Sequence, residues 1–232
     1  MIPVKDINPS RSTPVVTILI VLFCTLVFIY EVLLPASYRD IFVNMFAVIP
    51  LEIMKGVDIP PPDPLTPYGN LVSYQYLHGG LLHIFGNMLF LWVFGDNVED
   101  RLGKVKFFLF YTVCGIVAAL IHSFVYSDSK LPLIGASGAI SGVLGAYAVL
   151  FPRAKIVTLV FIFFFFDIIA LPAFIWIGIW FLVQFFSALV SMHHLSMGGV
   201  AWFAHIGGFL TGVLLTKLFV NGGKLETNAT LD

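Results

Sequence analysis

Long runs of apolar residues constrain this chain more than any other feature of its sequence. A helix needs about 20 consecutive apolar residues to cross the hydrocarbon core of a bilayer, and the chain has several such runs separated by polar segments. Composition agrees, because 59% of the 232 residues are hydrophobic and only 11% are charged, whereas soluble domains carry about 25% charged residues. The sequence therefore predicts an integral, multi-pass membrane protein.

Six runs are predicted to cross the membrane, at residues 15–34, 78–94, 107–126, 133–151, 171–190 and 200–220. The first run is too long for the core of a signal peptide and is followed by no cleavage motif, so we interpret it as a retained anchor. The segment GDNVEDRLGK, residues 95–104, is predicted to be a tight polar turn. The run TLVFIFFFF, residues 158–166, is short and ends before Asp167, so we expect a buried or interfacial connection there.

The distribution of Lys and Arg predicts the orientation. Given these spans, nine of the 12 basic residues fall on one side (Lys5, Arg11, Arg101, Lys104, Lys106, Arg153, Lys155, Lys217, Lys224) and three on the other (Arg39, Lys55, Lys130). Cytoplasmic loops are enriched in Lys and Arg, so both termini are expected in the cytoplasm. The protein itself is expected in the cell membrane.

The whole chain, residues 1–232, is expected to form a single membrane domain. We assign residues 1–13 to a cytoplasmic N-terminal segment, residues 35–77 to an external loop and residues 221–232 to a cytoplasmic tail. The prolines and mixed polarity of the external loop favour a cap on the membrane surface over an independent domain.

Several function classes lack their signature in this sequence. The net charge is −1 and basic blocks are missing, so a nucleic-acid partner is not expected. Cys24 and Cys114 are isolated in apolar runs, which disfavours a disulfide framework or a thiolate metal site. The chain has neither an HExxH zinc motif nor a pair of intramembrane aspartates, and GASGA is not the Gly-x-Ser-x-Gly elbow of soluble hydrolases. We expect no metal and no cofactor.

Polar side chains recur at one level of the predicted bundle. The second, fourth and sixth spans all begin at the outer face, and near these ends they carry His83 and Asn87, Ser137, and His205, respectively. At a rise of about 1.5 Å per residue, the four side chains fall at similar depths in the outer half of the bilayer. Polar residues inside hydrocarbon are costly and usually face a cavity or a partner, so their convergence predicts a site.

Packing and chemistry both explain the small residues around Ser137. Gly138 and Gly142 form a small-xxx-small pair that lets helices approach closely, and Ala204, Gly208 and Gly212 repeat that spacing. Taken singly, an intramembrane Asn or His often serves only to form a hydrogen bond between helices.

A serine and a histidine at one level also supply a nucleophile and its base. In this interpretation Ser137 and His205 are catalytic. The oxyanion of the reaction would be held by Asn87, His83 and the Ser137 backbone amide, and the loop geometry would depend on Gly135.

Four motifs in order resemble the rhomboid family of intramembrane serine proteases. They are HGGLLHIFGN (78–87), VEDRLG (98–103), GASGAISG (135–142) and GGVAWFAHIGG (198–208). The resemblance implies an all-α, six-transmembrane-helix bundle with a large outer loop between the first two helices. It also implies a catalytic dyad of Ser137 and His205, oxyanion support from His83 and Asn87, and structural roles for Glu99, Arg101, Gly138, Gly142 and Gly208.

The substrates implied by the resemblance are transmembrane segments of other proteins in the lipid bilayer. They would reach the site beside the fifth span, under the loop SMHHLSMGG, residues 191–199. The catalytic pair would have no third, acidic member, because burying a carboxylate in the spans would be expensive.

Two positions depart from patterns found in some rhomboids. Ser141 stands where a tyrosine would lie beneath the histidine, and the outer loop lacks a Trp-Arg pair. The remaining histidines, His78, His122, His193 and His194, are interpreted as polar residues of loops or span ends.

Two other functions remain open. One is a catalytically silent rhomboid-like protein that binds membrane clients. The other is a small transporter that moves protons through His205, although the chain shows no internal repeat of the kind such transporters carry.

Overall fold

The computed structural model describes residues 1–57, 59–62, 64–162, 165–191 and 200–221. Its six long helices are α1 (Val15–Leu33), α5 (Leu81–Leu102), α6 (Lys104–Val125), α7 (Ser137–Leu150), α8 (Ala173–Ser191) and α9 (Trp202–Asn221). Within the described residues, α1, α5, α6, α8 and α9 are long and apolar enough to cross a membrane, and α7 is a shorter apolar helix. The predicted bundle of six helices is confirmed, and the protein is a multi-pass membrane protein.

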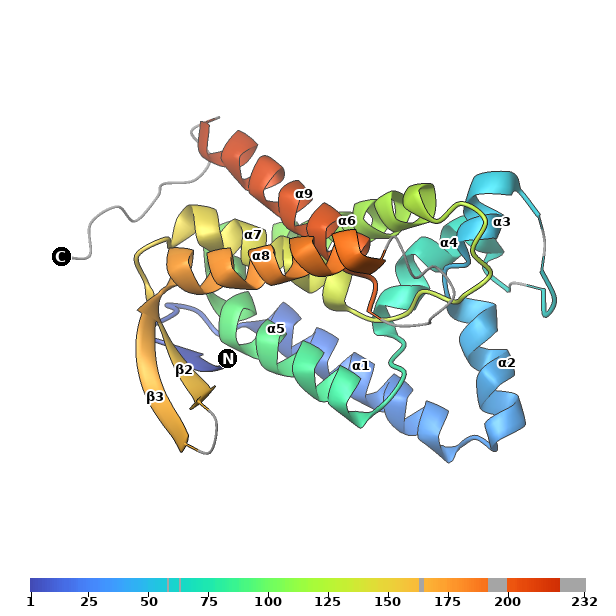
Figure 1. The fold of residues 1–232 in the computed structure, drawn as a ribbon, viewed down its shortest axis with the longest axis horizontal. Helices are drawn as coiled ribbons and strands as arrows, with labels where there is room; N and C mark the ends of the chain where they lie inside the picture. The colour runs from blue at the N-terminus through green and yellow to red at the C-terminus, as the bar shows by residue number, and fades with distance from the viewer. Residues whose placement is uncertain (58, 63, 163–164, 192–199, 222–232) are drawn as a thin grey trace.

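Helix α7 lies inside the bundle and contacts α5, α6, α8 and α9 (Figure 1). Eleven of its 14 residues are buried. A helix of 14 residues rises about 21 Å, which is less than the roughly 30 Å of the hydrocarbon core. Its C-terminal end lies beside the start of α8 (Figure 1), so its first residue, Ser137, falls short of the opposite ends of the longer helices.

Glycines allow the backbones of α7 and α9 to touch. A Cβ atom added to Gly208 would lie 2.0 Å from the carbonyl oxygen of Gly138, and one added to Gly212 would lie 2.0 Å from that of Gly142. No side chain fits in such a gap. The small-residue spacing noted in the sequence therefore serves close helix packing, in addition to any chemical role of Ser137.

The predicted polar turn at residues 95–104 is wrong. Helix α5 continues to Leu102, and the chain reverses at Gly103, whose φ of 77° is the left-handed conformation that glycine adopts without strain. Several polar residues of this stretch bond to distant parts of the chain, such as Asn97 to Asp6 and Asp100 to Ser12.

Glu99 is the clearest example. Its carboxylate accepts hydrogen bonds from the backbone N–H groups of Val16 at 2.9 Å and Thr17 at 2.8 Å, and from the Thr17 hydroxyl at 2.9 Å. Helix α1 has no side-chain cap of its own at Pro14, so the carboxylate from α5 caps it instead and also faces the positive end of its dipole.

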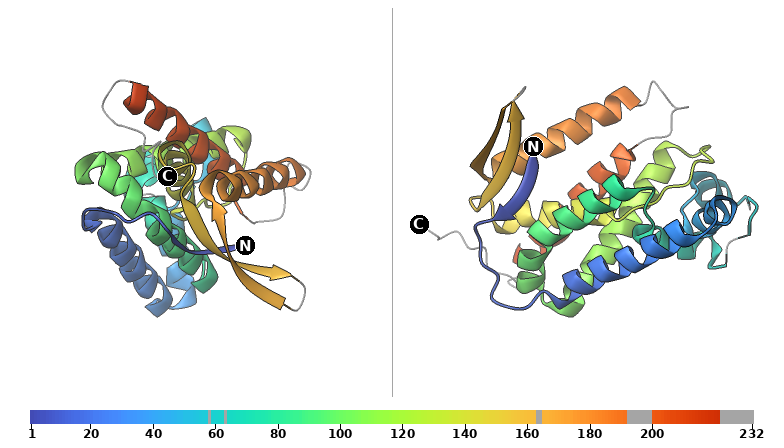
Figure 2. Two further views of the ribbon diagram at one scale, coloured as in Figure 1. Left: turned by 90° about the vertical axis from the view of Figure 1, so that its left-hand side faces the viewer. Right: turned by 90° about the horizontal axis from the view of Figure 1, so that it is seen from below.

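A three-stranded antiparallel sheet, which the sequence analysis did not anticipate, packs at one end of the helices. Its order is β1 (Ile2–Asp6), β2 (Lys155–Ile162) and β3 (Phe165–Pro172), and β3 runs directly into α8 (Figure 2). The segment 158–166 is thus a connection and not a crossing, as expected, but the connection is a hairpin. Asp6 ties the sheet to the bundle, because its carboxylate accepts hydrogen bonds from the Tyr147 hydroxyl and the Asn97 amide.

The segment 35–77 folds at the opposite end of the helices as α2 (Ala36–Phe46), α3 (Pro50–Lys55), α4 (Thr66–Ser73) and the short 3₁₀ helix η1 (Tyr74–Tyr76) (Figure 1). Tyr74 is buried, and its hydroxyl donates a hydrogen bond of 2.6 Å to the carbonyl oxygen of Gly115 on α6. The segment is therefore packed against the bundle, and it also contacts the loop that leads to Ser137.

Candidate active site

The loop before Ser137 is held by backbone hydrogen bonds from the segment 35–77. Leu133 and Val48 form an antiparallel bridge, and the N–H of Gly135 donates to the carbonyl oxygen of Tyr74 at 2.9 Å. Gly135 has a φ of 117°, and a Cβ there would lie 2.6 Å from Nε2 of His83. Both the conformation and the space require glycine at this position, and together they set where α7 begins.

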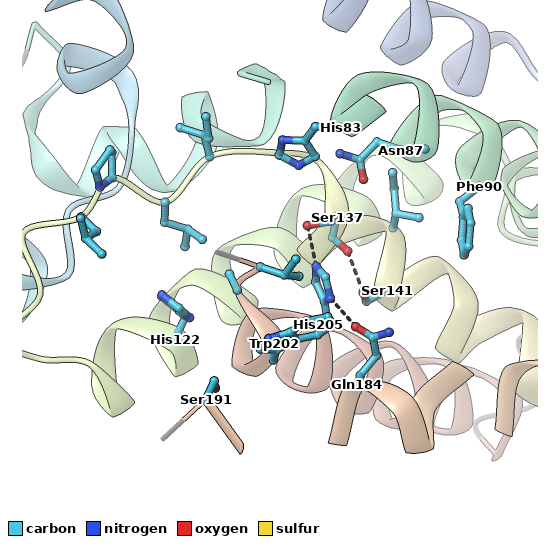
Figure 3. A pocket seen from close by; sticks show the side chains of 18 of the residues that line it. His83, Asn87, Phe90, His122, Ser137, Ser141, Gln184, Ser191, Trp202 and His205 are labelled. Carbon is cyan, nitrogen blue, oxygen red and sulfur yellow. Dashed lines mark hydrogen bonds between the residues drawn. The ribbon is translucent and has the colours of Figure 1, made fainter. Parts of the chain in front are cut away.

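Ser137 and His205 meet although 68 residues separate them. His205 lies in the first turn of α9, and its Nε2 is 2.8 Å from Oγ of Ser137 at the start of α7 (Figure 3). The glycine contacts between α7 and α9 allow this distance, because they bring the two backbones unusually close. The pair has the geometry of a nucleophile and its general base.

The other ring nitrogen of His205 contacts a residue that the sequence analysis missed. Its Nδ1 is 2.7 Å from Oε1 of Gln184 on α8 (Figure 3). The available signal was an amide side chain inside the predicted span 171–190, because polar side chains in hydrocarbon usually have a partner. Three helices thus contribute one side chain each to a chain of hydrogen bonds.

Two tryptophans enclose the His205 ring. The Trp180 ring lies 6.3 Å away with 31° between the ring planes, and the Trp202 ring lies 6.0 Å away, almost perpendicular at 85°. Ser141, which replaces the expected tyrosine, instead donates its hydroxyl to the carbonyl oxygen of Ser137 at 2.7 Å. The histidine is therefore seated by α8 and by its own helix, and not by a ring on α7.

A cavity of about 900 Å³ opens over the pair and is lined in part by His83, Asn87, Ser137, Gln184 and His205. Its volume lies within the range of ligand pockets, about 300–1,000 Å³. The Nδ2 atom of Asn87 is buried and donates no hydrogen bond to any of the described residues. A buried amide donor without a partner is costly. The amide of Asn87 is therefore available to donate a hydrogen bond to an acceptor that enters the cavity.

The N-terminus of α7 also borders the cavity. The amides in the first turn of a helix have no acceptor within the helix, and the positive end of the helix dipole adds to their attraction for an anion. The Ser137 N–H belongs to this turn. Of the predicted oxyanion groups, His83, Asn87 and Ser137 line the same cavity (Figure 3). Gly135 lies beside His83 and Asn87.

The remaining histidines differ from one another. His78 is buried beside His83, with 5.2 Å between ring centres. His122 lines the far side of the cavity (Figure 3). His193 and His194 lie outside the described residues, as does most of the loop predicted to cover substrate access, 192–199, and the tail 222–232. In the part of the chain that the structure describes, no cluster of His, Cys, Asp or Glu could hold a metal ion.

Comparisons with known proteins match the same region of the chain. The profile of the Rhomboid domain family matches residues 67–222. Rhomboid protein 1, mitochondrial, of Saccharomyces cerevisiae is 32% identical over 156 residues, which cover 66% of this chain and 42% of the yeast protein. RHOMBOID-like protein 4 of Arabidopsis thaliana is 29% identical over 174 residues, which cover 71% of this chain and 37% of that protein.

A shorter match is closer in sequence. Rhomboid protease GluP of Bacillus subtilis is 47% identical over 76 residues, which cover 33% of this chain and 14% of the Bacillus protein. The chain spans less than half the length of each of these relatives.

Proposed function

Because the chain belongs to the rhomboid family, we propose that it is an intramembrane serine endopeptidase that hydrolyses peptide bonds in or near the transmembrane segments of other membrane proteins. The observation that carries the proposal is the distance of 2.8 Å between Oγ of Ser137 and Nε2 of His205. A relative that is named a protease, GluP, supports it.

In the proposed reaction Oγ of Ser137 attacks the carbonyl carbon of the scissile peptide bond. Nε2 of His205 takes the hydroxyl proton as the new C–O bond forms. The C–N bond then breaks, His205 returns the proton to the leaving amine, and an acyl ester on Ser137 remains. A water molecule, deprotonated by His205, attacks this ester, and the proton passes back to Ser137 as the carboxylic acid leaves.

The negative charge that develops on the carbonyl oxygen needs donors that are already in place. Asn87 offers its unpartnered Nδ2–H, and the first turn of α7 offers the Ser137 N–H. His83 lies against Gly135 at the same edge and can add a third donor. Donors aimed at the position of the developing charge stabilise the transition state without having to reorganise.

The surroundings of the site suit a substrate that comes from the bilayer. The cavity opens among membrane-spanning helices and has room for several peptide atoms around Ser137, and a transmembrane helix would have to unwind locally before its amide could meet the serine. On the charge distribution along the sequence, we propose that both termini face the cytoplasm. The segment 35–77 would then cap the outer face.

The test is cleavage of a single-span membrane substrate by the purified protein in liposomes. We expect Ser137→Ala and His205→Ala each to remove nearly all cleavage, because residues that act as a unit lose their effect together. Ser127→Ala, a serine outside the cavity, is the matched control and should cleave normally.

Reaction of the wild type with a fluorophosphonate probe gives a second readout. Labelling at Ser137 that disappears in His205→Ala would support an activated serine. Substantial proteolysis by Ser137→Ala would refute the proposal, and a wild type that binds the substrate without cutting or labelling would favour the silent client-binding protein.

A further inference from the structure

We propose that Gln184 is a positioning residue that selects the reactive tautomer of His205. It lies on α8, outside the pair of helices that carries the serine and histidine, and nothing in the reaction described above requires it. The inference rests on the proposed function, since it concerns the base of that reaction. Its physical basis is the hydrogen bond of 2.7 Å between Oε1 of Gln184 and Nδ1 of His205.

The chemistry of the two atoms decides which nitrogen carries the proton. A carbonyl oxygen can only accept a hydrogen bond, so Nδ1 must donate the bond to Gln184. Neutral imidazole has one N–H group, which leaves Nε2 as an acceptor. That nitrogen lies 2.8 Å from Oγ of Ser137, so the serine hydroxyl donates to it. A general base needs this arrangement, and the opposite tautomer could not take the proton.

Helix α8 holds the amide in place. Gln184 is only 7% exposed, and Trp180, one turn earlier on the same helix, lies beside the same imidazole ring. Residues four apart share a helix face, so one face of α8 supplies both the acceptor and the aromatic wall. The α8 face thereby fixes the orientation of the ring as well as its tautomer.

An amide differs from a carboxylate in what it can do for the base. It accepts from Nδ1 without carrying charge, which spares the cost of a buried carboxylate in the membrane, but it gives less stabilisation to the imidazolium that forms. The titratable groups that share the cavity with His205 are His83 on α5, His122 on α6 and Tyr126, which directly follows α6. Among the described residues that line this cavity, none is acidic or basic apart from these. A carboxylate placed at position 184 would therefore be the dominant charge near the base.

Two substitutions of Gln184 separate positioning from packing. Gln184→Met keeps the length and much of the volume but offers only a weak acceptor. We expect it to lower kcat by about 10- to 100-fold, with KM changed less than about threefold, because one lost hydrogen bond to the base corresponds to roughly one to two factors of ten. Gln184→Glu keeps an acceptor for Nδ1 and should restore kcat to within about tenfold of the wild type at pH 8.

The pH profile gives a signature that packing alone would not produce. The carboxylate of Gln184→Glu favours the protonated imidazole, so the acidic limb of kcat/KM against pH should move to higher pH than in the wild type. Val183→Leu, on the lipid-exposed side of the same helix, is the matched control and should leave kcat and the profile unchanged.

The tautomer can also be observed without turnover. Ring ¹⁵N chemical shifts of His205 should show the Nδ1–H form in the wild type and a mixture of tautomers in Gln184→Met. Wild-type kcat and an unchanged tautomer in Gln184→Met would overturn the inference, as would equal losses in the Met and Glu variants accompanied by equal losses of melting temperature. Failure of the proposed function is a different result, namely a wild type that does not cleave or a Ser137→Ala variant that does.

Discussion

Gly212→Ala tests whether the α7 and α9 packing sets the distance between the serine and the histidine. Gly212 lies seven residues after His205 on α9, about 10 Å along the helix axis, so it touches none of the reacting groups. A methyl group there would lie 2.0 Å from the carbonyl oxygen of Gly142 on α7. The obstacle is backbone, and no rotation of a side chain can relieve it.

The size of the displacement follows from the contact distance. Ordinary van der Waals contact begins near 3.4 Å, so the helices must separate locally by about 1.4 Å to accept the methyl group. The 2.8 Å contact between Ser137 and His205 spans the same two helices. A misplacement of about 1 Å can cost about 10²-fold in rate even when the substitution is remote, and overpacking typically costs about 1–3 kcal/mol of stability. We expect kcat to fall by about 10²-fold.

The assay compares cleavage and thermal melting of Gly212→Ala with those of Gly178→Ala. Gly178 is a helical glycine on α8 whose added Cβ would meet no atom within 4 Å. Alanine is favoured over glycine in a helix by up to about 1 kcal/mol, so this control should melt at the same or a higher temperature with unchanged turnover. Normal turnover in Gly212→Ala would refute the reasoning, because the helices would then tolerate the methyl group without moving the reacting atoms.

Three further predictions concern single side chains. Asn87→Ala should lower kcat by about 10²-fold, the lower end of the range for one oxyanion donor, with little change in melting because its Nδ2 has no partner to lose among the described residues; unchanged kcat with a lowered melting temperature would instead indicate interhelical glue. Glu99→Gln should reduce stability by about 1.5–3 kcal/mol, since charge-assisted bonds to α1 are lost, while kcat per folded molecule, measured by titration of reactive serine, stays the same. Burial raises the pKa of Asp6 to about 6 from 3.8, and its proton is held more tightly in the folded state. Stability should therefore increase as the pH falls from about 7 to 4, and melting curves of Asp6→Asn should lose that increase; an identical pH dependence in the variant would contradict this.

The sequence by itself determined the membrane environment, the six long helices and the family. Each of these depends on contiguous residues: apolar runs have a length that can be compared with the bilayer, and the four motifs can be recognised in order. It also placed Ser137 and His205 at similar depths, because depth follows from counting residues from the end of a span at a constant rise. It predicted that residues 158–166 do not cross, since that run is too short.

Only the tertiary structure decided which faces of the helices meet. Depth along a helix does not specify rotation about its axis, so the contact of His205 with Gln184 on α8 could not be derived from spacing. The polar turn at 95–104 was predicted wrongly for a related reason: Glu99 looks like a loop residue until the start of α1, more than 80 residues away, supplies the N–H groups that satisfy it. The sheet likewise pairs Ile2–Asp6 with a strand about 150 residues later. Hydrogen-bonding groups on distant segments satisfy one another only after the chain has folded, and local sequence carries no record of which ones will meet.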